Sequence, residues 1–225
     1  MKTNFYNFTL LAISFLIYSC TRECKDCGLG SMVANYVQKY IEVDSTLILS
    51  VSKYDDSDSL PSWSVIFSSN IISDFSSDSA VRTKFKHYAV MNVDTNYFKP
   101  LGTCFFEPCL PFGNNRFDIY CEQDYGGIPA GQSLNHICIA YCHSVQNFVE
   151  SKYSLYPDET IPFTKDVIYD TLTYFNRRNT RLLSALDIRL YLVLRPLEPA
   201  DYRFVFKYED DSGIVLTDTV VSSVK

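Results

Sequence analysis

Eight cysteines are the residues of this 225-residue chain with the most to offer chemically. A cysteine thiol can accept a lipid, form a disulfide or bind a metal ion. Cys20 stands at the end of an apolar N-terminal run, and seven others follow it. They are Cys24, Cys27, Cys104, Cys109, Cys121, Cys138 and Cys142. This many cysteines is typical of a protein in an oxidising compartment, such as the periplasm or the cell surface.

Disulfide formation is the first chemistry to consider. With Cys20 set apart, seven thiols remain, so at most three disulfides form and one thiol is left over. On a single strand, Cys138 and Cys142 would lie about 13 Å apart, beyond the reach of a disulfide. We therefore expect at least one disulfide within residues 96–142, between non-adjacent cysteines. The candidates are Cys104, Cys109, Cys121, Cys138 and Cys142.

Metal binding is the second chemistry. Residues 24–27 form a CxxC motif, and His136 and His143 lie beside the last two cysteines. Structural zinc takes four ligands, frequently as two closely spaced pairs, and only one pair here has that spacing. A redox CxxC opens a helix in a βαβ unit, and the sequence has no such pattern. We expect no metal and no cofactor, and disulfide-bonded or unused thiols in the leader.

The sequence offers no catalytic signature. It contains no GxSxG, no HExxH, no P-loop and no strand-borne GxGxxG. Ser133, His136 and Cys138 are close in the sequence, but a catalytic triad is defined by geometry in space. The acidic segments 54–59, 76–79 and 209–213 lack the ligand spacing of a calcium loop. We therefore expect a protein that is not an enzyme.

The N-terminus has the features of an export signal. Lys2 is the only charge before Arg22, and an apolar run of 11 residues, 8–18, lies between them. A run of that length is too short to cross roughly 30 Å of hydrocarbon. A positive start, a short apolar run and a small residue before the break are typical of a secretory signal. The sequence predicts a signal peptide over residues 1–19.

The end of this run, Ile17-Tyr18-Ser19-Cys20, resembles the lipobox of bacterial lipoproteins. The resemblance implies that the Cys20 thiol receives a diacylglycerol, that residues 1–19 are removed and that the new amine is acylated. Stable anchoring needs more than one acyl chain, which a triacylated cysteine provides. Residues 20–30 would then form a lipidated leader. In lipoproteins an aspartate directly after the cysteine favours retention in the inner membrane, and Thr21 in this position therefore implies the outer membrane. The alternative is a soluble secreted protein that is cleaved nearby.

The charge of the exported chain excludes one class of partner. Without residues 1–19, 206 residues remain, with 19 basic and 26 acidic side chains and a net charge of −7. Nucleic-acid binding draws its affinity from clustered Lys and Arg, so we expect no nucleic-acid partner. A chain of 206 residues can bury one sizeable core, or two small ones.

The sequence after the leader predicts a β-rich domain. Tyr, Phe, Val and Ile favour strands, and alternating patterns recur along the chain. Strands are expected over 46–54, 63–67, 82–93, 116–120 and 135–142. Residues 144–152 and 180–186 are expected to form short helices, and 31–41 fits helix or strand. Residues 96–133, rich in Cys, Gly and Pro, are expected to be irregular, and are either a binding loop or a purely structural one.

The C-terminal third gives the clearest pattern. Strands are expected near 187–195, 201–208 and 214–221, as an antiparallel meander of adjacent neighbours. In the middle strand, Tyr202, Phe204 and Phe206 should face the core. The sequence thus predicts an all-β fold with minor α, an immunoglobulin-like or related β-sandwich over residues 31–225, with two small β domains as the alternative.

The chain as a whole resembles small lipoproteins of gut-type Gram-negative anaerobes, for which no activity is established. The resemblance rests on the lipobox, the cysteine-bearing leader, the aromatic β-rich body and a closing hairpin over 202–219. It implies a lipid-anchored envelope or surface protein with a non-catalytic binding or assembly role, whose protein or glycan partner is open. The alternative is an accessory carbohydrate-binding lipoprotein, which would need exposed, coplanar aromatic rings on one sheet face or in the 96–133 loop.

Overall fold

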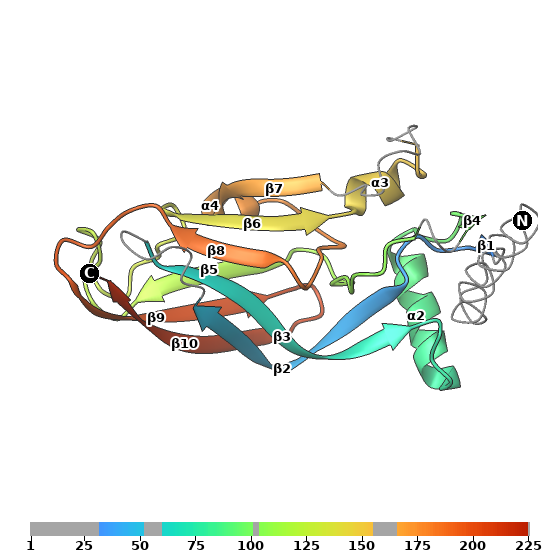
Figure 1. Ribbon diagram of the computed structural model, residues 1–225, viewed down its shortest axis with the longest axis horizontal. Coiled ribbons are helices and arrows are strands. Elements are labelled where there is room, and N and C mark those ends of the chain that lie inside the picture. The colour runs from blue at the N-terminus through green and yellow to red at the C-terminus, as the bar shows by residue number, and fades with distance from the viewer. Residues whose placement is uncertain (1–31, 52–59, 101–103, 155–165, 225) are drawn as a thin grey trace, which may run out of the picture.

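A computed structural model describes residues 32–51, 60–100, 104–154 and 166–224 (Figure 1). The strands are β1 (Met32–Val33), β2 (Lys39–Val51), β3 (Ser62–Ser73), β4 (Lys99–Pro100), β5 (Arg116–Cys121), β6 (Cys138–Ser144), β7 (Asp166–Thr171), β8 (Ile188–Leu192), β9 (Ala200–Glu209) and β10 (Val215–Val224). The helices are α2 (Ser79–Met91), α3 (Gln146–Glu150) and α4 (Leu172–Phe175). None of the helices in these ranges is long and apolar enough to cross a membrane.

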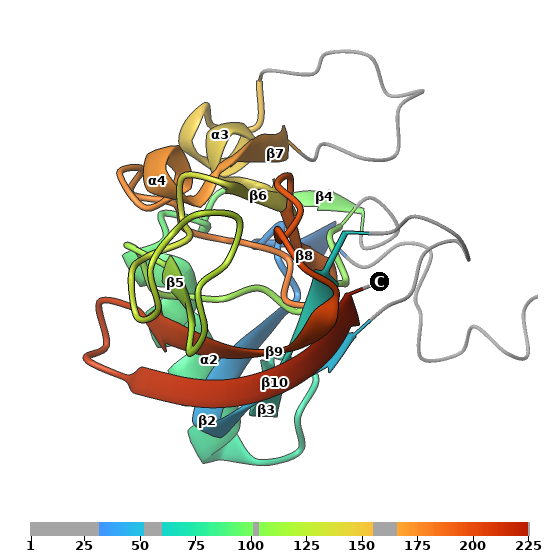
Figure 2. The same cartoon turned by 90° about the vertical axis from the view of Figure 1, so that its left-hand side faces the viewer.

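Two antiparallel sheets form the body of the molecule. The five-stranded sheet has the order β2-β3-β8-β6-β7, and the three-stranded sheet has the order β10-β9-β5. Figure 2 shows β6 and β7 on one side of the molecule and β9 and β10 on the other. The predicted all-β sandwich with minor α is confirmed. The expected signal peptide 1–19, Cys20 and the expected leader 20–30 lie outside the described residues.

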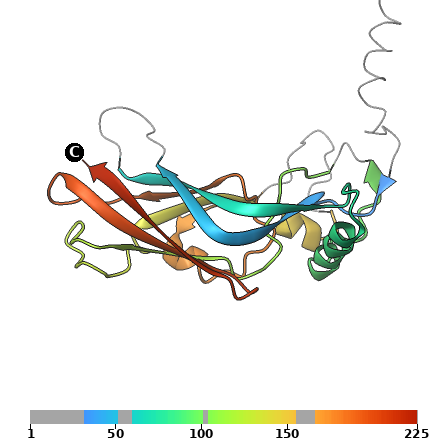
Figure 3. The same ribbon diagram turned by 90° about the horizontal axis from the view of Figure 1, so that it is seen from below.

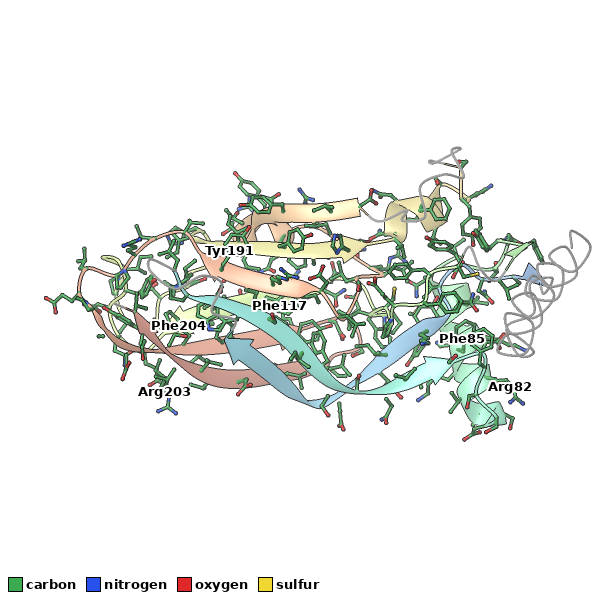
Figure 4. The ribbon with its side chains drawn as sticks, viewed as in Figure 1. Arg82, Phe85, Phe117, Tyr191, Arg203 and Phe204 are labelled. Carbon is green, nitrogen blue, oxygen red and sulfur yellow. The ribbon has the colours of Figure 1, made fainter. Side chains whose placement is uncertain are left out.

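The main core fills the space between these sheets. Trp63 on β3 is fully buried, and its ring centroid lies 4.9 Å from that of Phe204 and 4.8 Å from that of Phe206 on β9. The predicted inward face of β9 is confirmed, because Tyr202, Phe204 and Phe206 are all buried. Figure 4 shows Phe204 within the body and Arg203 directed outward.

The prediction of a C-terminal meander is only partly correct. β9 and β10 form the predicted hairpin, with Val215 opposite Glu209, and Gly213 in its turn has a φ of +84°. β8, however, pairs with β3 and β6 in the other sheet, so it is not a neighbour of β9. The connection 193–199 contains Pro196 and Pro199, which cannot donate ladder hydrogen bonds, and it carries the chain from one sheet to the other.

A second error concerns residues 82–93, which form most of helix α2 and not a strand. The Asp78 side chain accepts a hydrogen bond from Ala80 N at 2.8 Å and caps the helix. Phe85, Tyr88 and Ala89 are buried at helical spacing, and this face decides the conformation. Figure 4 shows Phe85 facing the body, whereas Arg82 points outward.

Of the remaining local predictions, some are confirmed and others are wrong. Helix α3 lies within the predicted helix 144–152, and residues 32–41 contain β1, an isolated bridge at Val37 and the start of β2, with no helix. Residues 180–186 are not helical, because Leu183 and Ser184 form isolated bridges to Ser144 and Cys109. Within the expected irregular segment 96–133, β4 and β5 are regular.

A second apolar cluster, which we call the end cluster, packs α2 and α3 against the start of β2. Its buried aromatic residues are Tyr36, Tyr40, Phe85, Tyr88, Tyr97, Phe105 and Phe148. Figure 3 shows β2 and β3 running along the molecule to the end where α2 lies.

One buried carboxylate organises the end cluster. Asp94 is fully buried, and it accepts hydrogen bonds from the backbone N–H of Tyr36 at 2.7 Å and of Val37 at 2.8 Å. The hydroxyl of Tyr153 donates to the same carboxylate at 2.8 Å. Burial raises the pKa of Asp94 and outweighs these three hydrogen bonds, which lower it. The carboxylate therefore joins three segments that are distant in the sequence.

Candidate functional site

The cysteines expected to form disulfides occupy buried positions. Cys121 ends β5, while Cys138 and Cys142 lie on the inner face of β6, and all three carry free thiols. Within the described residues, the structure therefore has no disulfide between any two of Cys121, Cys138 and Cys142. Burial raises the pKa of Cys142 to about 12, so its thiolate form is strongly disfavoured.

The other two candidate cysteines lie at the end cluster. Cys104 is partly buried, with its sulfur 3.7 Å from the carbonyl oxygen of Asn35, and burial raises its pKa to about 12. Cys109 is fully buried and forms isolated bridges with Tyr40 and Ser184. Both thiols are therefore held in packed surroundings, and we expect them to be less reactive than an exposed thiolate.

The irregular segment 96–133, expected to be either a binding loop or a structural one, has a structural role in its last part. Tyr125 is fully buried, and its hydroxyl donates to the carbonyl oxygen of Leu194 at 2.9 Å. The N–H of Leu134 donates to the carbonyl of Ile119 at 2.8 Å, which holds the loop against β5. Ser133, His136 and Cys138 are not brought together as a triad, because His136 is exposed while Cys138 is buried on the inner face.

The most distinctive surface is the outer face of β6, β7 and β8. Residues on this face alternate with the buried row of each strand, and the register places Tyr141 opposite Tyr169 and Arg189. Tyr191, two residues after Arg189 on β8, faces the same way. Figure 4 labels Tyr191 on this side of the sheet. We call this surface the tyrosine face; it consists of Tyr141, His143, Tyr169, Asp187, Arg189 and Tyr191.

A chain of polar contacts orders half of the tyrosine face. The Tyr141 hydroxyl lies 3.2 Å from Nε2 of His143, and His143 Nδ1 lies 3.0 Å from Oδ2 of Asp187. This second contact has the distance of an ion pair but not the alignment of a hydrogen bond. The tautomer with its proton on Nδ1 leaves Nε2 to accept from Tyr141.

Arg189 completes this network. Its Nε lies 3.0 Å from Oδ1 of Asp187, so one carboxylate contacts both Arg189 and His143. The guanidinium carbon also lies 5.7 Å from the centroid of the Tyr141 ring, within cation–π range. These contacts restrict the rotamers of the four side chains, because moving one would break contacts to the others.

The other half of the face consists of two tyrosine rings. Tyr169 is 62% exposed, and its ring centroid lies 5.9 Å from that of Tyr191, with an angle of 48° between the planes. Burial raises the pKa of Tyr191, and its hydrogen bond with Tyr169 raises it further. The Tyr169 ring is thus exposed and the Tyr191 ring is partly buried on one sheet face, and the two rings form inclined facets and not a coplanar platform.

A polar pocket adjoins the tyrosine face at the start of β7, and we call it the β7 pocket. Its volume is about 380 Å³, within the range of small-molecule sites. Val167 belongs to its wall and is also the register partner of His143, so the pocket and the face are contiguous. The other lining residues are Ser144, Gln146, Asn147, Asp166, Ile168, Arg178, Asn179 and Thr180.

Sequence reasoning did not find this face, although part of its signal was visible. In the segment 135–142, Cys138 and Cys142 are buried on one side of β6, and Ile139 and Tyr141 lie on the other. The core lies on the side of the small residues, so the tyrosine side faces outward. Among residues 32–51, 60–100, 104–154 and 166–224, no group of three His, Cys, Asp or Glu side chains is arranged to hold a metal.

Comparisons with known proteins give no further guide to the site. No protein-family model matches the chain, and neither a curated protein nor a solved structure is significantly similar to it. The function must therefore be inferred from the residues and their geometry.

Proposed function

We propose that this protein is a lipid-anchored protein of the bacterial outer membrane with a non-catalytic binding role. The anchor is supported by the sequence Ile17-Tyr18-Ser19-Cys20, which has the pattern of a lipobox, and by the short apolar run before it. The lipid on Cys20 would hold the β-sandwich at the membrane surface, and residues 20–30 would connect the two.

The binding role rests on the tyrosine face. Tyr169 and Tyr191 present aromatic surface on one side of a sheet, and aromatic rings combine apolar contact area with few rotatable bonds. The neighbouring polar side chains are already ordered by their contacts with one another. Such a preorganised surface loses little conformational entropy when a ligand binds.

The same geometry favours binding over catalysis. The polar groups of the face lie on an open sheet surface, and Asp187 is engaged by both His143 and Arg189. A catalytic site instead directs its reactive groups toward one point in a cavity that excludes water. We therefore assign these three side chains to ordering the surface and not to proton transfer.

Site-specific photocrosslinking tests the binding role. A benzophenone side chain placed at position 169 in the full chain should form adducts in intact cells, since it replaces a ring at the proposed contact surface. The matched control is position 75: Phe75 is 55% exposed, against 62% for Tyr169, but lies in the turn between β3 and α2. Adducts at 169 and not at 75 are expected. No adduct at 169, or the same adducts at both positions, would contradict the proposal.

A further inference from the structure

We infer that the ligand of the tyrosine face is a neutral glycan chain, with sugar rings on Tyr169 and Tyr191 and an adjoining sugar in the β7 pocket. This inference rests on the proposed binding role and names its ligand class. It is argued from the shape of the aromatic surface, the balance of charge on the face and the polarity of the pocket.

The aromatic surface fits a stack of sugar rings. One face of a pyranose carries C–H groups, which pack favourably on the electron-rich face of an aromatic ring. The rings of Tyr169 and Tyr191 lie 5.9 Å apart and are inclined by 48°. Two facets at such an angle fit consecutive sugars of a single chain that are turned relative to each other. A flat crystalline polysaccharide would instead need coplanar rings.

The charge of the face favours a neutral ligand. The Asp187 carboxylate contacts Arg189 Nε at 3.0 Å and His143 Nδ1 at 3.0 Å, so the charges at this place are balanced within the face. A strongly charged ligand would have to displace these contacts, and each displaced charge would lose its partner. A hydroxyl-rich neutral ligand can hydrogen-bond to the same groups without breaking them.

The β7 pocket has the donors and acceptors that sugar hydroxyls need. Asn147 contributes an exposed amide group and Thr180 a buried hydroxyl. Gln146 and Ser144 also line the pocket, but their side chains are already hydrogen-bonded to Glu150 and to the backbone of Arg181. The Thr180 hydroxyl is buried and makes no hydrogen bond within the described chain. Buried polar groups are normally paired, so this hydroxyl points to a polar group of a ligand or to water. A volume of about 380 Å³ accommodates a sugar with ordered water.

A protein partner would use the surface differently. Tyrosine and arginine are also enriched at protein interfaces, so the rings alone do not separate the two ligand classes. Protein interfaces bury an apolar centre and keep polar groups at the rim. The pocket next to the tyrosine face has amide and hydroxyl groups in its wall, and it therefore favours a glycan over a protein ligand. A protein ligand is therefore an outcome of the test and not a second proposal.

Affinity electrophoresis of the full chain, in a detergent without a sugar headgroup, tests the inference directly. The probes are soluble starch, xylan, galactomannan and a mixed-linkage β-glucan in native gels. We expect at least one to retard the protein. Tyr169→Ala and Tyr191→Ala should each weaken binding about tenfold, as expected for loss of one stacking contact. Phe75→Ala should leave it unchanged, and Tyr169→Phe, which keeps the ring, should retain most of it.

The pocket needs a variant of its own. Asn147→Ala should weaken binding severalfold, because its side chain lines the pocket and is exposed on a short helix. Circular dichroism should show that each variant is folded. Retardation that is unaffected by the tyrosine variants, or none with any probe, would overturn the inference. If protease-sensitive adducts form at position 169 while every glycan fails, the binding role stands and the glycan is wrong. Absence of those adducts would instead overturn the binding role.

Discussion

The indole N–H of Trp63 on β3 donates a hydrogen bond to the hydroxyl of Ser222 on β10, at 3.3 Å, and so joins the two sheets. Both side chains are buried, and the indole ring lies against Phe204 and Phe206. The apolar core of the sandwich is thus built around a polar contact between strands that are not paired with each other. Removal of a neighbouring ring should therefore affect both sheets.

Phe204→Ala should destabilise the protein strongly. Phe204 is fully buried, and its ring contacts Trp63 at 4.9 Å and Tyr125 at 5.4 Å between centroids. Loss of a buried phenylalanine costs about 3–5 kcal/mol in free energy of unfolding. Lys207→Ala is the matched control on the outer side of β9, where only a surface ion pair with Glu209 is lost. Equal, small shifts in thermal melting would contradict the assigned inward face.

Asp94→Ala should destabilise the end cluster. Without the carboxylate, the backbone N–H groups of Tyr36 and Val37 lose their acceptor, and an unsatisfied buried donor costs about 1–3 kcal/mol. Asp74→Ala, in the exposed turn after β3, is the control and should change stability by less than about 0.5 kcal/mol. Chemical denaturation of both variants measures the difference; equal effects would mean that Asp94 does not organise this end.

The contribution of Asp94 should also depend on pH. Its pKa is raised in the folded protein by burial, so folding favours its protonated form. The resulting stability is fully present below the ordinary aspartate pKa and is lost as the pH rises through the raised value. The stability difference between the wild type and Asp94→Ala should therefore shrink from about pH 4 toward neutrality. A difference that grows over this range would contradict the direction of the pKa shift.

Cys138 and Cys142 should resist alkylation in the native protein. Both thiols are fully buried on the inner face of β6, and burial raises their pKa values. Iodoacetamide followed by mass mapping should modify them only after denaturant is added. Rapid labelling of the native protein, or recovery of either residue in a disulfide from protein made in an oxidising compartment, would contradict the described packing.

Cys20→Ala should release the protein from membranes and block normal removal of residues 1–19. The thiol is the expected site of lipid attachment, and the body alone has no acyl chain to insert. Membrane fractionation and the intact mass of the mature chain measure the two effects. A Cys20→Ala protein that fractionates like the wild type would exclude this anchor.

Local patterns predicted the fold where burial alternates within one segment. The strands around Trp63 and Phe204 follow period two. On β9 the buried row is the one expected from the sequence, and on β3 the apolar residues Trp63, Val65 and Phe67 are buried. Helix α2 was missed because the alternation of its aromatic and basic residues, read without the Asp78 cap, also fits a strand. The cap and the buried set Phe85, Tyr88 and Ala89 show how tertiary packing overrides such a pattern.

The tyrosine face could not be predicted because it depends on strand order. Tyr169 and Tyr191 are 22 positions apart, and they meet only because β7 and β8 flank β6 on opposite sides. A local reading placed β8 beside β9 because their connection is short. Side-chain alternation indicates which residues share a face of one strand, but not which strands share a sheet.

The long β2–β3 hairpin has a consequence for how the molecule unfolds. Trp63 and Val65 of β3 belong to the main core, while Ile72, at the far end of the same strand, belongs to the end cluster. On β2, Ile41 packs in the main core and the adjacent Tyr40 in the end cluster. Neither cluster can lose its packing without freeing a strand that the other requires. Calorimetry should therefore record a single cooperative transition, in which both ends of the molecule melt together.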